Sequence, residues 1–268
     1  MKNRISPSEL WNLIGTANAP SIVDVRIAED IADIPFAIPG SAPRSYNDVA
    51  GWANQFSGKI VVISCHKGLK LSEGVAAQMR LRGIAAIVLE GGSVAWRDAG
   101  LPAVKLASLP EKVDGITRWV TRERPKIDRI ACPWLIRRFV DPNAEFLFVA
   151  ASQVKGVAER FNATPFDIEG VFWSHRGETC TFDMMIEEFG LSCPALEAVA
   201  QIVRGADTAR LDLAPQAAGL LAISLGLSRN FHNDLAQLDA GMLVYDALYS
   251  WARDGQGETH NWPAKTSQ

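Results

Sequence analysis

The chain has 268 residues and a formal net charge of −3, with 48% hydrophobic and 21% charged residues. This length predicts two domains or one large one, and the composition excludes disordered, collagen-like and coiled-coil chains. No apolar run approaches the roughly 18 residues that a membrane-spanning helix needs. No apolar segment follows the charged N-terminus, so a secretion signal is not expected. We expect a cytoplasmic protein without a membrane partner, and the small net charge does not favour nucleic acid.

The first hundred residues alternate short β-branched runs with helical patterns, which is typical of a parallel sheet covered by helices on both faces. The apolar runs 21–25, 60–64 and 85–89 predict buried strands. A helix over 72–82 would join the last two in a right-handed βαβ unit. Sheets of this kind carry their chemistry at the carboxyl ends of the strands.

The apolar pattern loosens between Pro102 and Pro125. We therefore divide the chain into an α/β domain at 1–107, a linker at 108–125 and a mainly helical α+β domain at 126–268, and we expect the two halves to fold separately. For the second domain the patterns predict a strand pair at 145–150 and 171–174, and helices over 194–204, 215–225 and 231–253.

A cysteine follows the predicted strand 60–64 directly, and a helix begins a few residues later. A short loop between a strand and a helix turns successive main-chain N–H groups inward, and with the helix dipole these groups attract an anion. Lys67 and Lys70 add positive charge nearby. A thiol at Cys65 would lie in a positive field, which is how sulfur nucleophiles are activated. The other interpretation is an ordinary buried cysteine.

This segment and its flanks resemble the rhodanese family over about residues 5–104. The matching segments are Asp24-Val25-Arg26, Ile38-Pro39-Gly40-Ser41, the loop Cys65 to Ser72, Leu89 to Trp96 and Ala99 to Pro102. The resemblance implies a rhodanese-like fold and a sulfurtransferase that forms a persulfide on Cys65 without a cofactor. It also implies substrate-binding roles for a further set of residues: Arg26, His66, Lys67, Gly68, Leu69, Lys70 and Ser72.

Two features depart from the family pattern. Lys70 stands where the family has arginine, which keeps the charge but loses the planar fork that suits an oxyanion. The loop also reads one residue longer than the common sulfurtransferase version. Longer loops in this fold are associated with phosphatase-like relatives, so phosphatase or arsenate-reductase-like chemistry remains an alternative.

The second domain resembles the C-terminal domain of the chromate-resistance protein family. The matching segments are 126–138, 165–167, 175–183, 204–207 and 241–249. The resemblance implies a link to chromate or another oxyanion. It leaves open whether the domain acts with an enzyme or reports oxyanion or redox stress to a partner.

Within the second domain, His175, Glu178, Cys180 and Asp183 lie within nine residues. An imidazole, a thiol and two carboxylates can bind a divalent metal if the turn brings them together, although the spacing matches no standard zinc motif. The alternative is a hydrogen-bonded core cluster without an ion. Cys132 is expected at the start of a helix, where the helix dipole would lower the pKa of its thiol. The alternative is that it serves as a small apolar core residue.

The sequence thus predicts a sulfurtransferase whose partners are a small sulfur donor, a thiol acceptor and an oxyanion. It does not indicate which donor and acceptor are used, or the oligomeric state.

Overall fold

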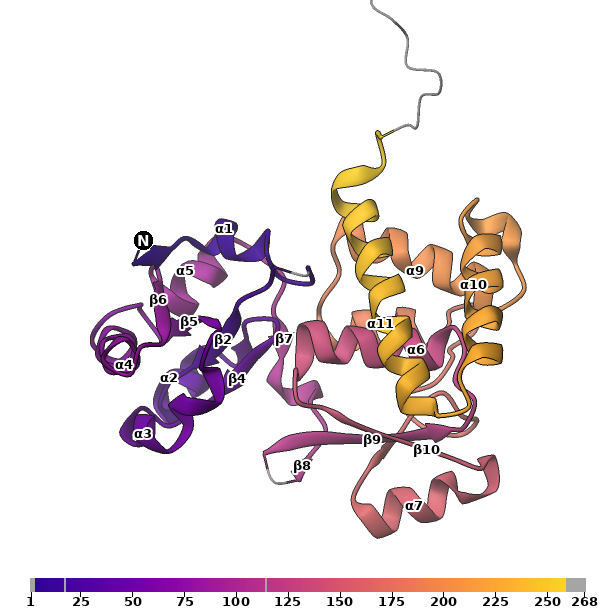
Figure 1. Ribbon diagram of the computed structural model, residues 1–268, viewed down its shortest axis with the longest axis horizontal. Helices are drawn as coiled ribbons and strands as arrows, with labels where there is room; N and C mark the ends of the chain where they lie inside the picture. The colour runs from indigo at the N-terminus through magenta and orange to yellow at the C-terminus, as the bar shows by residue number, and fades with distance from the viewer. Residues whose placement is uncertain (1–2, 17, 114, 259–268) are drawn as a thin grey trace, which may run out of the picture.

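The computed structural model describes residues 3–16, 18–113 and 115–258, and it has two halves that lie side by side (Figure 1). The first half is built on a parallel sheet, as expected, and this sheet has five strands in the order β1-β6-β5-β2-β4. Its strands are β1 (Arg4–Ile5), β2 (Ser21–Asp24), β4 (Ser41–Pro43), β5 (Ile60–Ser64) and β6 (Ala85–Leu89). A small antiparallel pair joins β3 (Phe36–Ala37) to β7 (Val104–Lys105). The helices are α1 (Pro7–Trp11), α2 (Ala28–Asp33), α3 (Val49–Trp52), α4 (Lys70–Leu81) and α5 (Gly92–Asp98).

Strand β5 shows why the sheet needs cover on both faces. Successive side chains of a strand point to opposite faces. Val61 and Ile63 pack in one apolar cluster with side chains of α3 and α4, whereas Val62 packs in another with side chains of α1 and α5. All three side chains are fully buried.

The second half combines a small mixed sheet with helices. Its strands are β8 (Lys112–Val113), β9 (Ile116–Arg122), β10 (Glu145–Val149) and β11 (Thr164–Pro165). Its helices are α6 (Asp128–Leu135), α7 (Val154–Phe161), α8 (Thr181–Phe189), α9 (Pro194–Asp207), α10 (Ala217–Asn230) and α11 (Asp234–Ser250). One π-helical turn follows α6 at Ile136–Val140 and another follows α11 at Trp251–Gly255.

The segment 108–125, expected as a linker, contains the central strand of this second sheet. Strand β9 pairs in parallel with both β10 and β11, and β8 pairs with it in an antiparallel hairpin. Trp119 and Val120 are fully buried there. Residues 171–174, all described, form no strand; Trp173 only makes a bridge with Phe166.

Two helices continue through glycines that were expected to end them. Helix α9 runs past Gly205, which packs closely against Ala217, and α10 runs past Gly226. Helix α11 begins at Asp234 rather than 231.

The two halves share one apolar core instead of packing separately. Leu10 and Ile14 of the first half belong to the same cluster as Trp134, Phe139 and Tyr249 of the second. The halves approach each other closely at Gly15, whose φ is +77° and where an added Cβ would lie 2.5 Å from Phe139 Cζ. The Gly40 N–H also donates to the Phe139 carbonyl at 2.7 Å. The second half therefore packs against apolar side chains of α1 and the turn that follows it.

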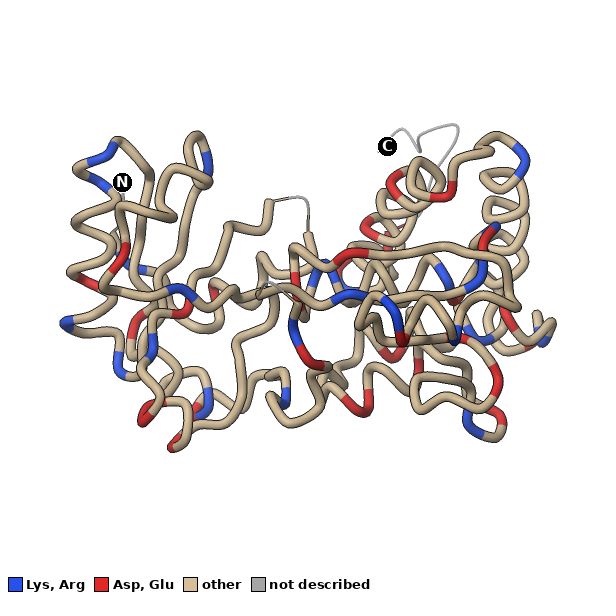
Figure 2. The backbone as a smooth tube through the Cα atoms, turned by 90° about the horizontal axis from the view of Figure 1, so that it is seen from below, with Lys and Arg blue, Asp and Glu red and all other residues tan. Residues whose placement is uncertain are grey.

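Positive and negative residues are interspersed along both halves of the chain (Figure 2). None of the described helices is long and apolar enough to cross a membrane.

Candidate functional site

Cys65 lies immediately after the last residue of β5, at the carboxyl edge of the parallel sheet. It is 4% exposed, and its Sγ lies 3.2 Å from the Oγ of Ser72. Ser72 is in the first turn of α4 and is fully buried. The hydroxyl therefore links the thiol at the strand end to the start of the helix.

Helix α5 fixes the position of the Cys65 loop through main-chain hydrogen bonds. The N–H groups of Ser93 and Val94 donate to the carbonyls of Cys65 and His66, both at 3.0 Å. Gly68 has a φ of +65°, and an added Cβ would meet the Leu89 carbonyl and lie 2.8 Å from Gly91 N. Only glycine fits this contact without a shift of the main chain. The loop carbonyls are thus used to fix the loop against α5.

The N–H groups of the same loop remain available. Among the described residues, no hydrogen bond is donated by the main-chain N–H groups of residues 66–72. Lys67 and Lys70 are exposed, and neither takes part in an ion pair within the described part of the chain. Free N–H groups at a helix start and two nearby cations form a suitable environment for an anion. Leu69 of the same loop is 56% exposed.

Two expected substrate-binding residues have structural partners. Arg26 is buried, with its Nε donating to Asp24, its Nη1 to the Ile34 carbonyl at 2.9 Å and its Nη2 to the Phe36 carbonyl at 2.7 Å. Each nitrogen of this guanidinium is engaged in holding the segment after β2, which corrects the expectation that it binds substrate. His66 Nε2 lies 3.3 Å from Asp33 of α2.

A second cluster of chemically active groups surrounds His175. Its Nε2 lies 3.4 Å from Asp128 Oδ2, 3.3 Å from Asp167 Oδ1 and 3.3 Å from Asp207 Oδ2. Asp128 begins α6, Asp207 ends α9, and Asp167 and His175 lie in the segment between β11 and α8. Three carboxylates from distant parts of the chain therefore converge on one imidazole nitrogen.

The structure corrects the metal-ligand set expected from the sequence, because only His175 of that set belongs to the cluster. Glu178 is exposed. Asp183 accepts from Cys180 N at 3.0 Å and from Arg204 at 2.8 Å, so it caps α8 and pairs with α9. Cys180 is fully buried, and burial raises the pKa of its thiol far above the usual range, which keeps it protonated.

Cys132 lies one helical turn into α6 rather than at its start, and it is also fully buried. Burial raises the pKa of its thiol well above the usual value, which is opposite to the expected effect of a helix dipole. It therefore acts as an apolar core residue.

Asp128 is the most buried member of the cluster, with 0% of its side chain exposed. Its Oδ2 accepts from Thr181 N at 2.6 Å, and its Oδ1 has no hydrogen-bond partner. Burial raises the pKa of this carboxyl to about 6. Close contact with the carboxylates of Asp128, Asp167 and Asp207 raises the pKa of His175 to about 12. The carboxylates thus hold the imidazole in its charged form.

The residue before Asp128 is in an unusual conformation. Ile127 has a φ of 44°, which a β-branched side chain rarely adopts. Its N–H donates to Ser224 Oγ of α10 at 3.2 Å, and its carbonyl accepts from Tyr245 of α11 at 3.0 Å. These two helices therefore fix the point at which α6 begins.

A pocket of about 690 Å³ opens beside the cluster, and its walls include His175, Asp167, Arg122 and Lys155. Asp167 Oδ2 lies 3.3 Å from Arg122 and 3.3 Å from Arg129, so the position of this carboxylate is fixed on the side away from the imidazole. The cluster is thus reachable from solvent through His175, whose side chain is 40% exposed.

Sequence reasoning missed Asp128, Asp167 and Asp207. Each lies in a segment that resembles the chromate-resistance family, so a signal was present. It could not be read as a site, because these residues are up to 79 positions apart and only the packing of α6 against α8 and α9 brings them together.

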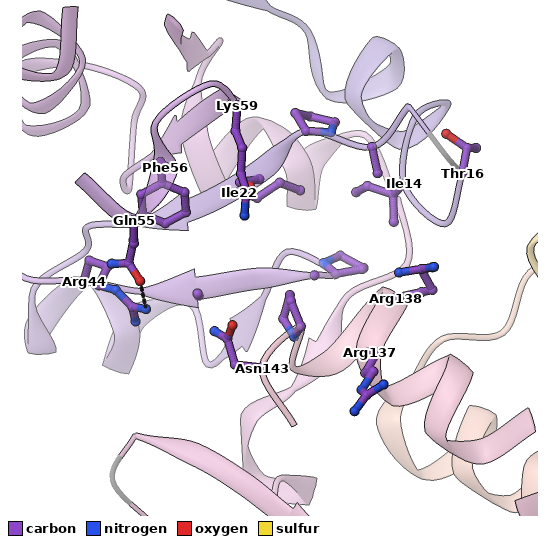
Figure 3. Close-up of a pocket in the computed structure, with 17 residues that line it drawn as sticks. Ile14, Thr16, Ile22, Arg44, Gln55, Phe56, Lys59, Arg137, Arg138 and Asn143 are labelled. Carbon is purple, nitrogen blue, oxygen red and sulfur yellow. Dashed lines mark hydrogen bonds between the residues drawn. The ribbon is translucent and has the colours of Figure 1, made fainter. Parts of the chain in front are cut away.

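A third feature is a pocket of about 520 Å³ between the two halves (Figure 3). Arg44 and Lys59 line it from the first half, Arg137 and Arg138 from the second, and no acidic residue is among its described lining residues. Arg138 is neutralised by Asp246, with both contacts at 2.8 Å, whereas the Arg44 side chain donates to Gln55 and to the Pro43 carbonyl and forms no ion pair with a described residue. The pocket lies at the start of β2 and β5, the opposite end of the sheet from Cys65.

Comparisons with known proteins match each half separately. A family model described as the C-terminal domain of ChrB matches residues 119–252. Protein ChrB of Cupriavidus metallidurans is 34% identical over 134 residues, which are 50% of this chain and 40% of that protein. The chain therefore matches less than half the length of this curated relative.

The first half is similar to rhodanese-like proteins of known structure. A rhodanese-like domain protein from Staphylococcus aureus is 32% identical, with a TM-score of 0.32, over 36% of this chain and 91% of that chain. A thiosulfate sulfurtransferase from Pseudomonas aeruginosa is 24% identical, with a TM-score of 0.32, over 38% of this chain and 19% of that chain. The family model confirms the expected chromate-resistance domain, and the first half has the parallel sheet that the resemblance to rhodaneses implies.

Proposed function

The chain belongs to the ChrB C-terminal domain family through residues 119–252, and we propose that its N-terminal domain is a sulfurtransferase that carries sulfur on Cys65. The observation that supports this most directly is the position of the thiol. Cys65 follows β5 at the carboxyl edge of the sheet, and the N–H groups of the loop that follows it have no acceptor among the described residues. Chemistry in sheets of this kind takes place at that edge.

The proposed reaction has two steps, in both of which sulfur moves to a thiolate. The Cys65 thiolate attacks the outer sulfur of thiosulfate, the S–S bond of the donor breaks, and sulfite leaves with the bonding electron pair. A thiolate acceptor then attacks the outer sulfur of the Cys65 persulfide and takes it, which regenerates the Cys65 thiolate. The protein needs no cofactor for either step.

The loop supplies binding rather than proton transfer. The N–H groups of residues 66–72 stabilise the negative charge on the donor and on the persulfide, and Lys67 and Lys70 attract the anionic donor to the loop. Ser72 hydrogen-bonds Cys65 and orients its sulfur. Because Cys65 is only 4% exposed, the donor must be small enough to enter between the loop and α4.

The test is the intact mass of the protein after incubation with thiosulfate. We expect the wild type to gain one sulfur atom and to lose it again when a thiol acceptor is added. Cys65→Ser should gain none, whereas Cys193→Ser should behave like the wild type, since Cys193 is a half-buried thiol outside the loop. Absence of the adduct in the wild type with any small sulfur donor, or its persistence in Cys65→Ser, would contradict the proposal.

A phosphatase or arsenate-reductase-like reaction remains the alternative for the same loop. Hydrolysis of a phenyl phosphate ester that depends on Cys65, in a protein that forms no persulfide, would assign that reaction instead.

A second candidate function, binding of an oxyanion as a signal, is favoured by the pocket between the two halves. Arg44 and Lys59 carry positive charge that no acidic residue of the described lining offsets, and the pocket contacts both domains. A bound oxyanion would bridge the domains at a place distant from Cys65.

Titration calorimetry with sulfate and chromate tests this second function. We expect the Arg44→Gln, Lys59→Gln double variant to lose binding and Cys65→Ser to keep it. The reverse result would place the oxyanion at the loop and remove the second function.

A further inference from the structure

The arrangement around His175 differs from an ordinary histidine–carboxylate pair. A charged N–H···O bond is normally about 2.7–2.9 Å long, and one imidazole nitrogen carries one hydrogen. Here three carboxylate oxygens lie at 3.3–3.4 Å from the same Nε2. Three equal long contacts cannot all be hydrogen bonds from one N–H group.

The same distances are those between ligands of one metal ion. Nitrogen and oxygen ligands lie about 2.1 Å from a first-row divalent ion, which places neighbouring ligands about 3.0 Å apart in an octahedral site and about 3.4 Å apart in a tetrahedral one. One donor atom each from Asp128, His175 and Asp207 lies within 4.8 Å of the others. An ion between these three atoms would replace the proton on Nε2.

A separate observation, the state of Asp128, also indicates a missing positive partner. Its carboxylate is completely buried, yet its Oδ1 has no hydrogen-bond donor. A buried charged oxygen without a partner is costly, and native proteins rarely leave one. The start of α6 thus presents an unsatisfied carboxylate oxygen in the interior, on the residue whose other oxygen lies 3.4 Å from the imidazole nitrogen.

We propose that Asp128, His175 and Asp207 bind a divalent first-row transition metal ion. One imidazole and two carboxylates form a mixed nitrogen and oxygen donor set, which suits Mn²⁺ or Fe²⁺ better than the soft ions that thiolates select. The nearby Cys132 and Cys180 do not alter this choice, because neither belongs to the set of described donor atoms that lie within 4.8 Å of one another.

The site has the form of a reactive metal centre rather than a closed structural one. Three protein ligands leave coordination positions free, and His175 lines the adjoining pocket. Arg122 and Lys155 in the walls of that pocket favour an anionic ligand in the free positions. Asp167, fixed by Arg122 and Arg129, borders the ion on the pocket side.

The experiment is a Mn²⁺ titration of the full chain after bound metals have been removed and their absence has been checked by elemental analysis. Free Mn²⁺ gives a strong paramagnetic resonance signal that disappears on binding, so the signal reports affinity directly. We expect the wild type to bind one ion, and His175→Gln and Asp207→Asn to bind it at least about 100-fold more weakly, since loss of even an outer partner of a metal ligand costs 10–100-fold.

Two matched variants serve as controls. His232→Gln removes another exposed imidazole, and Glu178→Gln removes the exposed carboxylate nearest to His175 in sequence; both should bind Mn²⁺ like the wild type. Circular dichroism of the metal-free variants checks that each is folded. His175→Gln is suited to this because its side chain is already 40% exposed.

The proposal is overturned if the folded wild type binds no Mn²⁺, or if His175→Gln binds it as well as His232→Gln does. A melting curve gives an independent readout. Mn²⁺ should raise the melting temperature of the wild type and leave that of His175→Gln unchanged, because an ion that binds only the folded state stabilises it.

Discussion

The two candidate sites are assembled in opposite ways. The Cys65 loop comes from one stretch of chain, with β5, the loop and α4 in succession and α5 following β6. The His175 cluster takes its side chains from the start of α6, the segment before α8 and the end of α9. The loop geometry is therefore set by local main-chain hydrogen bonds, whereas the cluster geometry exists only when the second half is packed. Substitutions that disturb the main chain of the loop should therefore affect the Cys65 site. Substitutions that disturb the packing of the second half should affect the His175 cluster.

Truncation after Ala107 is the most severe test of whether the Cys65 loop can form without the second half of the molecule. The shared core predicts that it is not, because Leu10 and Ile14 would lose the second-half side chains that cover them. We expect the fragment 1–107 to aggregate or to lack a cooperative melting transition, as judged by size-exclusion chromatography and circular dichroism. A soluble fragment that still forms the Cys65 persulfide would show that the first half folds separately after all.

Gly68→Ala tests whether close main-chain packing sets the loop geometry. The new Cβ would meet the Leu89 carbonyl at a positive φ, and overpacking together with this conformation should cost about 2–4 kcal/mol of unfolding free energy. Persulfide formation should be lost as well, while Mn²⁺ binding stays. Gly74→Ala in α4, where an added Cβ meets no atom within 4 Å, should instead stabilise by about 0.5–1 kcal/mol. Denaturant unfolding compares the two, and equal effects would contradict a special role for Gly68.

Gly15→Ala perturbs the junction between the halves. The Cβ would lie 2.5 Å from Phe139 and 2.7 Å from Tyr249, both fully packed aromatic side chains, so we expect a loss of about 2–3 kcal/mol. Gly100→Ala is the matched control, since its φ is +63° but an added Cβ has no atom within 4 Å, and it should cost only about 1 kcal/mol. If the two variants lose the same unfolding free energy, the loss at Gly15 comes from its backbone conformation alone, and the close contact between the halves adds nothing to it.

Asp183→Asn is expected to have the smallest effect, and it distinguishes the observed cluster from the ligand set expected from sequence. Loss of the charged contacts to Cys180 N and Arg204 should cost about 1 kcal/mol. Mn²⁺ affinity should not change, because Asp183 is not a ligand. A large loss of affinity in the titration would restore the sequence-based set.

The sequence predicted most of the first half, because its strands are continuous apolar runs. Strands β5 and β6 lie at the expected residues, and the loop follows from the residues after β5. Strand β9 was missed for a physical reason. Its buried residues include Thr117 and Thr121, whose polar side chains hide the strand pattern, and Thr117 is buried only because Asp141 accepts its hydrogen bonds.

The His175 cluster could not be predicted in full from the sequence for a related reason. A carboxylate such as Asp128 reads as a surface residue at a helix start until its partners are known. Local spacing favoured Glu178, Cys180 and Asp183, but the turn directs them elsewhere. Long-range packing, rather than spacing, determined the set.

The shared core also has a consequence for how the two sites could influence each other over time. Segments of a folded protein open and close with free energies set by the contacts that hold them. Because Leu10 and Ile14 pack in one cluster with Trp134 and Tyr249, an opening of the second half removes part of the apolar cluster that also contains Val62 of β5. A ligand that binds the second half only when it is closed would make such openings rarer throughout the cluster. The frequency with which buried amides of β5 exchange with solvent would then depend on a ligand that never touches that strand.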